Sequence, residues 1–331
     1  MLEPLKRLYR KFSVRAHVAR LERAVNSTRE RISTFQDEDR SRINELRELM
    51  KRNQALNRES MRAGTIDTWQ VIDALDSLRF PPEMDVRCGI CGYHAPKRTF
   101  ETKISQCRFG GGRLERFVCP ECGCVFGPLK MSLMTQGELE QDYRRCFMAY
   151  TWNISRQELV TAESVVTDPK KVYLNYGSGA DPENGTAAIM RRKGYQVYAY
   201  EPYAAGEKNL PDWLITSEER LRNMRFDAIY SNDLLEHLQD PAETLLFMKS
   251  LLKDGDSFME HSTSCYEYRQ EFTRFHLFFF TGRSLNVLCR RTGLRAEQVA
   301  NTDQVEKDHQ YISYRFYPET GEAGRNAPRH D

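Results

Sequence analysis

The feature that most constrains the fold is an apolar segment, residues 172–176, that runs directly into the turn Gly177-Ser178-Gly179. A second apolar segment, residues 195–200, follows and ends at an acid, Glu201. Glycine lets the backbone turn sharply and approach a ligand, and an acid at the end of the next strand can accept both ribose hydroxyls. This pattern predicts an α/β domain that holds an adenosine cofactor. The nicotinamide fingerprint G-x-G-x-x-G fails, because Pro182 stands where its third glycine would be.

Strand and helix patterns alternate over the rest of the C-terminal half. The helix at 241–252 has an apolar stripe at helical spacing, and the strand at 257–261 ends on His261. Such alternation is typical of a doubly wound parallel sheet covered by helices on both faces. The expected elements are strands at 212–216, 226–230, 257–261 and 311–317, and helices at 241–252 and 282–293.

The order of these motifs resembles class I S-adenosylmethionine-dependent methyltransferases over residues 165–320. The matching motifs are the strand with its G-x-G turn, the strand ending in Glu201, the Phe-Asp-Ala-Ile-Tyr strand and the segment Asn232-Asp-Leu-Leu-Glu-His-Leu238. The resemblance implies a doubly wound, seven-stranded Rossmann-like α/β domain and S-adenosylmethionine as cofactor. It also implies the cofactor contacts, which are Tyr176, Gly177, Ser178 and Gly179 through the backbone, Glu201 on the ribose, Pro202 beside the adenine, and Asn232 and Asp233. The family's usual acid at the end of the first strand is Asn175 here, so one contact to the methionine amine is expected to differ.

Two C-x-x-C pairs precede this domain, Cys88/Cys91 and Cys119/Cys122, with 27 residues between them. Paired knuckles of this kind can place four thiolates around one Zn²⁺, and glycines follow the cysteines where tight turns are needed. Four cysteine ligands leave no open position for water, so the predicted zinc ribbon, residues 85–128, is structural. Incidental reduced cysteines are the alternative, and Cys124 could replace Cys122 in an irregular knuckle.

The second knuckle has the sequence Cys-Pro-Glu-Cys-Gly and is followed by Val125-Phe-Gly-Pro128 and a helix that contains tyrosine. This succession is similar to that of a subgroup of bacterial methyltransferases that act on sugars. This similarity covers residues 85–320. It implies a carbohydrate acceptor, either nucleotide-linked or on a lipid-linked glycan, in surface-polysaccharide or nucleotide-sugar synthesis. Tyr266 and Tyr268 could line the acceptor pocket, although loop packing explains them equally well.

In the sugar-modifying subgroup, a His-x-x-x-Phe-[Ser/Thr] segment supplies the general base. His276–Thr281 resembles that segment with one additional residue, so His276 is the first candidate base and His237 the second. Phe275 stands where the subgroup often has Glu, so an orienting carboxylate would have to come from Glu271 or Glu267. A half-buried structural imidazole is the alternative reading of His276.

Residues 1–62 are charge-rich and carry apolar residues at spacings of three and four, which predicts an amphipathic or coiled-coil helix. The helix could form a homodimer or pack on its own protein. Its first 24 residues hold seven Lys/Arg against two Glu, a net of +5, so peripheral contact with an anionic membrane is a further option. Residues 63–84 and 129–164 are expected to be linkers, the second one helical, and 321–331 a disordered tail.

Composition narrows the function classes. A formal net charge of +2 gives no global field for nucleic acid, and no apolar run is long enough to span a bilayer. Nine cysteines without a secretory signal favour a cytoplasmic protein. Two other hypotheses remain, an RNA base methyltransferase that uses the ribbon for recognition and a non-catalytic scaffold that keeps the cofactor fold.

Overall fold

The structure is a computed structural model that describes residues 69–319 apart from short gaps, and a few helical positions between 26 and 60. The gaps are at 77, 109–111, 136–137, 140, 144–155, 180–182, 207–208, 269–271, 300–303 and 307–308. The chain divides into two compact units, Met1–Ser60 and Met61–Asp331. The apolar seam expected in the N-terminal helix, its basic start and the tail at 321–331 lie outside the described residues.

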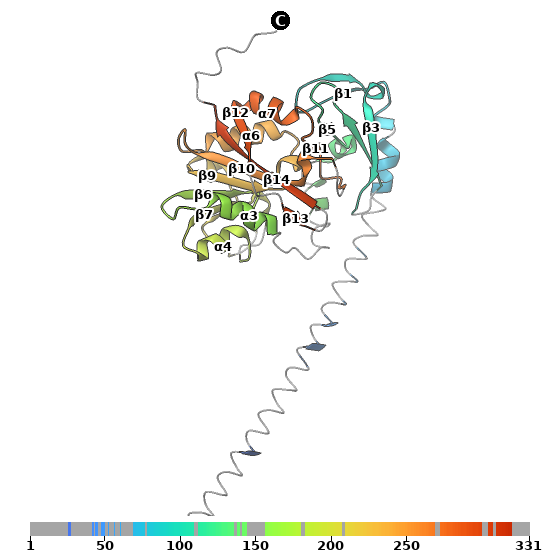
Figure 1. Ribbon diagram of the computed structural model, residues 1–331. Helices are drawn as coiled ribbons and strands as arrows, with labels where there is room; N and C mark the ends of the chain where they lie inside the picture. The colour runs from blue at the N-terminus through green and yellow to red at the C-terminus, as the bar shows by residue number, and fades with distance from the viewer. Residues whose placement is uncertain are drawn as a thin grey trace, which may run out of the picture. The chain divides into compact units, whose positions relative to one another are not determined.

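The second unit is built on a large mixed sheet with the strand order β12-β14-β10-β9-β6-β7-β8 (Figure 1). The neighbours from β8 to β10 pair in parallel, whereas β14 runs antiparallel to β10 and β12. This confirms the predicted α/β fold with a mostly parallel sheet. The strands are β6 (Val172–Tyr176), β7 (Gln196–Tyr200), β8 (Leu214–Ile215), β9 (Ala228–Asn232), β10 (Phe258–Thr263), β12 (Leu294–Gln298), β13 (Gln304–Glu306) and β14 (His309–Pro318).

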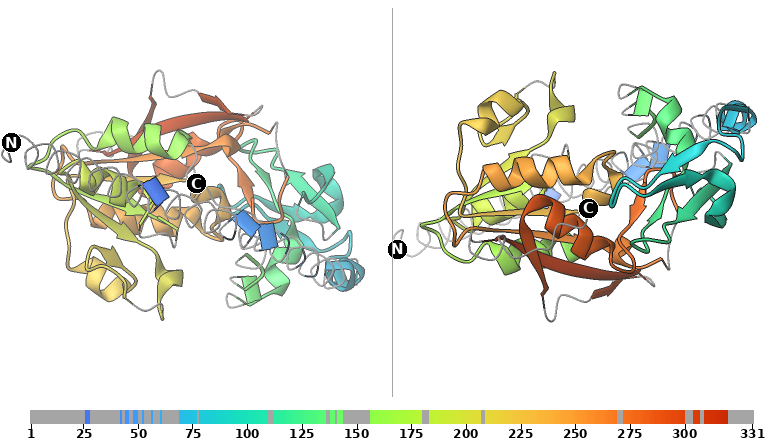
Figure 2. Two further views of the ribbon diagram at one scale, coloured as in Figure 1. Left: turned by 90° about the horizontal axis from the view of Figure 1, so that it is seen from below. Right: turned by 90° about the horizontal axis from the view of Figure 1, so that it is seen from above.

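Helices cover both faces of this sheet (Figures 1 and 2). Alternate strand residues face opposite layers, as the twofold period of a strand requires: Tyr173 packs in the core with Ala162 and Met190, and Leu174 in the core with Leu245 and Leu288. The first layer is α3 (Arg156–Val165) with α4 (Thr186–Arg192), and the second is α6 (Pro241–Ser250) with α7 (Ser284–Thr292). A short helix, α5 (Glu218–Arg222), lies next to β8, and 3₁₀ turns occur at η1 (Lys97–Thr99), η2 (Leu129–Leu133), η3 (Pro202–Ala204), η4 (Leu235–His237) and η5 (Ser264–Tyr266).

The cysteine-rich segment shares a sheet and a core with the methyltransferase-like part. Its strands are β1 (Asp85–Arg87), β2 (His94–Pro96), β3 (Glu101–Gln106), β4 (Arg113–Val118) and β5 (Val125–Phe126). The sheet order is β11-β5-β4-β3, where β11 (Phe278–Phe279) comes from the far C-terminal part of the chain. Phe117 and Phe126 belong to the same buried cluster as Phe278 and Phe280. Segments that look separate in sequence are therefore built as one body.

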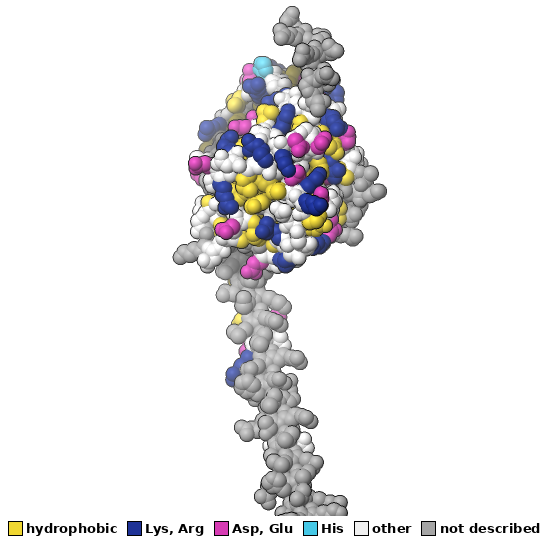
Figure 3. All heavy atoms as spheres, turned by 90° about the vertical axis from the view of Figure 1, so that its left-hand side faces the viewer, with side chains coloured by type: hydrophobic (Ala, Val, Ile, Leu, Met, Phe, Trp, Pro, Cys, Tyr) yellow, Lys and Arg dark blue, Asp and Glu magenta, His cyan; other side chains and the backbone are white. Residues whose placement is uncertain are grey.

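Charges of both signs are interspersed over the face shown in Figure 3, as the small net charge leads one to expect. Among the described residues, no helix combines the length and the apolar character that crossing a membrane requires.

Candidate active site and metal centre

The glycine turn after β6 is tied to the end of β7 by backbone hydrogen bonds. Gly177 has φ +75° and donates its N–H to the carbonyl of Tyr200 at 2.9 Å. Gly179 has φ +70° and donates to Oε2 of Glu201, also at 2.9 Å. A Cβ on Gly177 would lie 3.0 Å from Leu234 Cδ1, in a backbone conformation that side chains rarely adopt, so this position favours glycine. The turn and the acid predicted to share one ligand are therefore adjacent.

Glu201 is a fixed carboxylate with only 8% of its surface exposed. It caps η3, where Oε1 accepts a hydrogen bond from the backbone N–H of Tyr203 at 3.2 Å, and Pro202 opens that turn. Backbone donors on both oxygens hold the carboxylate at the carboxyl end of β7, where the ligand of such a sheet binds.

Asn232 and Asp233 lie where β9 ends. Oδ1 of Asn232 is buried and has no hydrogen-bond partner within the described structure, as expected of a group that a ligand satisfies. Asp233 has φ +44°, and its Oδ2 accepts from the Tyr311 hydroxyl at 3.3 Å. Burial, reinforced by the Glu236 charge, raises the pKa of Asp233 well above its usual range. These features fit S-adenosylmethionine. The residues that would contact it are Gly177, Gly179, Glu201 and Asn232.

Two of the residues expected near the cofactor have internal partners. Asn175 donates to Thr186 Oγ1 at 3.0 Å, which in turn contacts the Tyr230 hydroxyl, so Asn175 joins β6 to α4. The Tyr176 ring packs against Tyr200 with centroids 4.9 Å apart. Only the backbone of Tyr176 is left for a contact in the glycine turn.

An acid and two histidines form a cluster beyond the carboxyl ends of β9 and β10. Glu236 and His237 belong to η4, and His276 lies just before β11. One ligand atom from each lies within 4.8 Å of the others, and the two imidazole centroids are 4.9 Å apart. Both candidate bases are therefore brought together. Their joint neighbour is Glu236, not Glu267, and Glu271 lies outside the described residues.

Glu236 is fully buried, with 0% of its surface exposed. The Thr263 hydroxyl donates to its Oε1, and its Oε2 lies 3.5 Å from His261 Nε2. His261 sits inside β10, not at its end, because the strand continues to Thr263. Burial acts to raise the pKa of Glu236, but the contacts with His261 and then His237 outweigh it, so the pKa lies below its usual range.

His276 is half-buried and held by both its ring and its backbone. Nδ1 lies 3.4 Å from Cys265 Sγ, and the backbone N–H contacts Thr273. Burial, and after it the neighbouring His237, lowers the pKa of His276 to about 3. Burial lowers the pKa of His237 as well. At neutral pH, both imidazoles are uncharged beside an ionised carboxylate.

The loop that carries His276 is clamped by two buried arginines. Arg274 forms a bidentate ion pair with Asp142, at 2.6 and 2.8 Å, and stacks over the Trp69 ring. Arg116, from β4, donates to the carbonyls of Thr273 and His276 at 2.6 and 3.2 Å. The cysteine-rich segment thus directly contacts the candidate catalytic loop.

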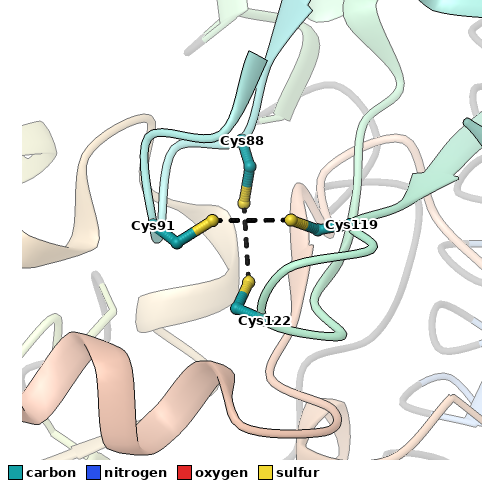
Figure 4. A group of neighbouring side chains, drawn as sticks. All are labelled: Cys88, Cys91, Cys119 and Cys122. Carbon is teal, nitrogen blue, oxygen red and sulfur yellow. Dashed lines mark hydrogen bonds between the residues drawn. The ribbon is translucent and has the colours of Figure 1, made fainter. Parts of the chain in front are cut away.

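The four predicted zinc ligands converge (Figure 4). The sulfurs of Cys88 and Cys122 are 3.8 Å apart and those of Cys91 and Cys119 3.4 Å apart, with all four within 4.8 Å. Zn–S bonds of about 2.3 Å arranged tetrahedrally require sulfur–sulfur separations of about 3.8 Å. The donor set and the spacing fit Zn²⁺.

The two knuckles have the same backbone pattern. Gly92 and Gly123, both at positive φ, donate to the carbonyls of Cys88 and Cys119, each at 2.9 Å. Cys124 is not one of the four clustered residues, and its Sγ lies 3.3 Å from the Phe279 carbonyl. The regular knuckle with Cys122, not the irregular one with Cys124, is therefore the one that the structure forms.

A cavity of about 430 Å³ lies between η5, the start of α7 and strands β12 and β14. Tyr266 and Tyr268, the aromatic residues expected beside an acceptor, both line it, together with Glu267, Asn286 and Tyr314. The Tyr266 ring is 6.2 Å from that of His261, which in turn lies next to Glu236.

Comparison with known proteins supports a methyltransferase domain. Residues 144–299, just under half of the chain, match a family model described as "Methyltransferase domain". No curated protein matches the chain. The matched residues include the parallel strands and the glycine turn with Glu201, so the comparison supports an enzyme with an S-adenosylmethionine-dependent methyltransferase domain.

Solved structures similar to the chain are remote. A 1,6-didemethyltoxoflavin-N1-methyltransferase from Burkholderia thailandensis is 14% identical, with 62% of this chain and 98% of that chain covered and a TM-score of 0.41. A TehB-like SAM-dependent methyltransferase from Corynebacterium glutamicum is 16% identical, with 55% and 97% covered and a TM-score of 0.35.

Sequence reasoning missed Glu236 as the acid of the cluster. The signal was available, because Glu236 directly precedes His237 in the motif after the fourth strand. It also missed Asp142 and Arg116, which act through contacts between residues more than 130 positions apart in the chain.

Proposed function

We propose that the enzyme transfers the methyl group of S-adenosylmethionine to a hydroxyl group of a carbohydrate. The acceptor would be a nucleotide-linked sugar or a lipid-linked glycan of surface-polysaccharide synthesis. The observation that carries this proposal is the Glu236–His237–His276 cluster, located at the strand ends beside the residues that fit the cofactor.

Bound S-adenosylmethionine supplies an electrophilic methyl group on its sulfonium. The hydroxyl that attacks it must lose its proton, and in this proposal His276 receives that proton as general base. The imidazole is uncharged and its Nδ1 is engaged by Cys265, so in this proposal Nε2 is the atom that would receive the proton. His237 is the second candidate, because it lies beside His276 in the same cluster.

The acceptor class is supported by two features. One is the cysteine-rich segment, whose sequence motifs are similar to those of sugar-modifying methyltransferases. The other is the aromatic cavity lined by Tyr266 and Tyr268, since sugar rings stack on aromatic faces. We also propose that Cys88, Cys91, Cys119 and Cys122 hold a structural Zn²⁺.

Binding of RNA by the ribbon gains no support from its basic residues. Arg116 is buried and bonded to the His276 loop, and Lys97 pairs with Glu115 at 2.7 Å. Arg98 and Lys103 also pair with glutamates on the surface. These charges are offset locally, and a stripe of basic and aromatic side chains is missing from the described part of the ribbon.

A turnover assay with the purified full chain tests the proposal. S-adenosylhomocysteine release is measured with a panel of nucleotide-linked sugars, lipid-linked glycans and RNA. Turnover with a carbohydrate is expected, and His276→Asn should lower it by about 100-fold or more while S-adenosylmethionine binding persists. Turnover with RNA alone would overturn the acceptor class, and full activity of His276→Asn would remove His276 from its role.

A further inference from the structure

The Glu236–His237–His276 cluster holds more coordinating capacity than its protein contacts use. Glu236 Oε1 is occupied by Thr263, but Oε2 is buried and makes no hydrogen bond in the described structure. His237 Nδ1 is likewise buried without a hydrogen-bond partner. A buried polar atom is costly to leave without a partner, so an unsatisfied carboxylate oxygen and an unsatisfied imidazole nitrogen in one cluster indicate a missing ligand.

His261 does not fill that role. Its Nε2 lies 3.5 Å from Glu236 Oε2, but both atoms remain without a hydrogen bond. Its Nδ1 already contacts the Ser231 hydroxyl at 2.8 Å. Thr263 and His261 thus contact the Glu236 carboxylate in the way that residues around a metal site orient a metal ligand.

We propose that Glu236, His237 and His276 bind a divalent cation. Two imidazoles and one carboxylate, with ligand atoms within 4.8 Å of one another, form a set that suits Mn²⁺, Fe²⁺, Co²⁺ or Zn²⁺ better than Ca²⁺. This centre is chemically distinct from the four-cysteine site, which has only sulfur donors. Glu236 is buried, whereas the two histidines are only half-buried.

This inference rests on the proposed function and refines it. Three protein ligands leave coordination positions for the acceptor, and two neighbouring positions suit two adjacent hydroxyls of one sugar ring. The cation lowers the pKa of the bound hydroxyl, whose proton passes to solvent water. The C–S bond of the sulfonium then breaks as the C–O bond forms. In the cation-loaded enzyme His276 is a ligand and not the general base, so the cation replaces the base role proposed above while the acceptor class and the transferred methyl group stay the same.

Calorimetric titration with Mn²⁺ tests the site. The full chain is first loaded with one equivalent of Zn²⁺ to fill the four-cysteine site, because Mn²⁺ prefers oxygen and nitrogen ligands over thiolates. One further Mn²⁺ should bind per chain. Glu236→Gln should weaken that binding at least about tenfold, since even outer residues of metal sites contribute roughly 10–100-fold. Glu243→Gln, at an exposed carboxylate on α6, should bind Mn²⁺ like the wild type.

Because Glu236 is part of the core, loss of Mn²⁺ binding in Glu236→Gln could also result from misfolding. A second variant therefore tests the same site. His237→Asn changes a half-buried residue and should also weaken Mn²⁺ binding at least about tenfold while S-adenosylmethionine still binds. No Mn²⁺ binding by wild type, or unchanged binding by both variants, would overturn the inference. Cation-independent turnover of a carbohydrate would overturn it too and leave the proposed function standing. A bound cation without carbohydrate turnover would overturn only the acceptor class.

Discussion

At the scale of single residues, Glu201 is the proposed ribose ligand, and its substitution tests that contact. Glu201→Gln keeps the shape but removes the charge, and a charge-assisted hydrogen bond contributes about 1.5–3 kcal/mol. S-adenosylmethionine binding should therefore weaken by about 10- to 100-fold in isothermal titration calorimetry. Glu219→Gln, at an exposed position on α5, is the matched control and should bind normally. Equal affinity of the two variants would contradict a ribose contact by Glu201.

The residues that sequence could reveal are those whose role is local. Gly177, Gly179 and Glu201 occupy one turn and the end of the next strand, and the structure ties them together as that spacing requires. Asn175 differs, because its partner Thr186 depends on how α4 docks onto β6. Glu236 was visible in the motif, but the choice among candidate acids depends on which one the fold buries beside both histidines.

At the scale of elements, one cysteine knuckle packs closely against the turn before α7. Gly282 has φ +62°, and a Cβ there would lie 2.9 Å from both the Cys122 carbonyl oxygen and Gly123 Cα. The neighbouring Thr281 hydroxyl and Arg283 N–H bond to the same knuckle at 2.5 and 2.7 Å. These contacts leave little room for the backbone to move away.

Gly282→Ala should therefore destabilise the protein by about 2 kcal/mol or more, because it adds left-handed strain to a clash with backbone atoms. Gly255→Ala is the control: Gly255 has open space around it and a φ outside the left-handed region. It should change stability by no more than about 0.5 kcal/mol. Urea unfolding measures both, and equal midpoints would refute the close approach.

The element that sequence could not reveal is β11. Two residues, Phe278 and Phe279, are too short to give a periodic pattern, and their partner β5 lies about 150 positions earlier. The longer parallel strands were predictable because each forms a buried apolar run of its own. The ribbon therefore looked like a separate segment, although its sheet is completed by the methyltransferase part.

At the scale of the whole molecule, that shared sheet joins the four-cysteine cluster to the candidate active site. The carbonyl of Leu277 accepts from Gly127 of the ribbon, and its N–H donates to the carbonyl of Glu236 at 2.6 Å. Arg116 and the Arg274–Asp142 pair clamp the same loop. Since the loop is held from both sides, loosening the ribbon should also loosen His276.

Metal removal should consequently lower the stability of residues 61–331 as a unit. A ligand present at about 1,000 times its Kd stabilises by about 4 kcal/mol, which corresponds to about 7 °C in Tm for a unit of this size, at roughly 2.1 cal/mol/K of unfolding entropy per residue. A chelator should shift one cooperative transition of the wild type by that amount in differential scanning calorimetry. Cys91→Ser should already melt low and be insensitive to chelator, because it lacks a ligand.

Cys289→Ser is the control for that experiment, since Cys289 is a buried cysteine of α7 outside the metal cluster. It can lower Tm through its own burial, but the chelator should still shift its transition as it does in the wild type. Two separate transitions, with only a small one sensitive to chelator, would show that the ribbon unfolds alone. The paired strands β5 and β11 argue for a single transition, because the ribbon cannot unfold without breaking the sheet that borders the active-site loop.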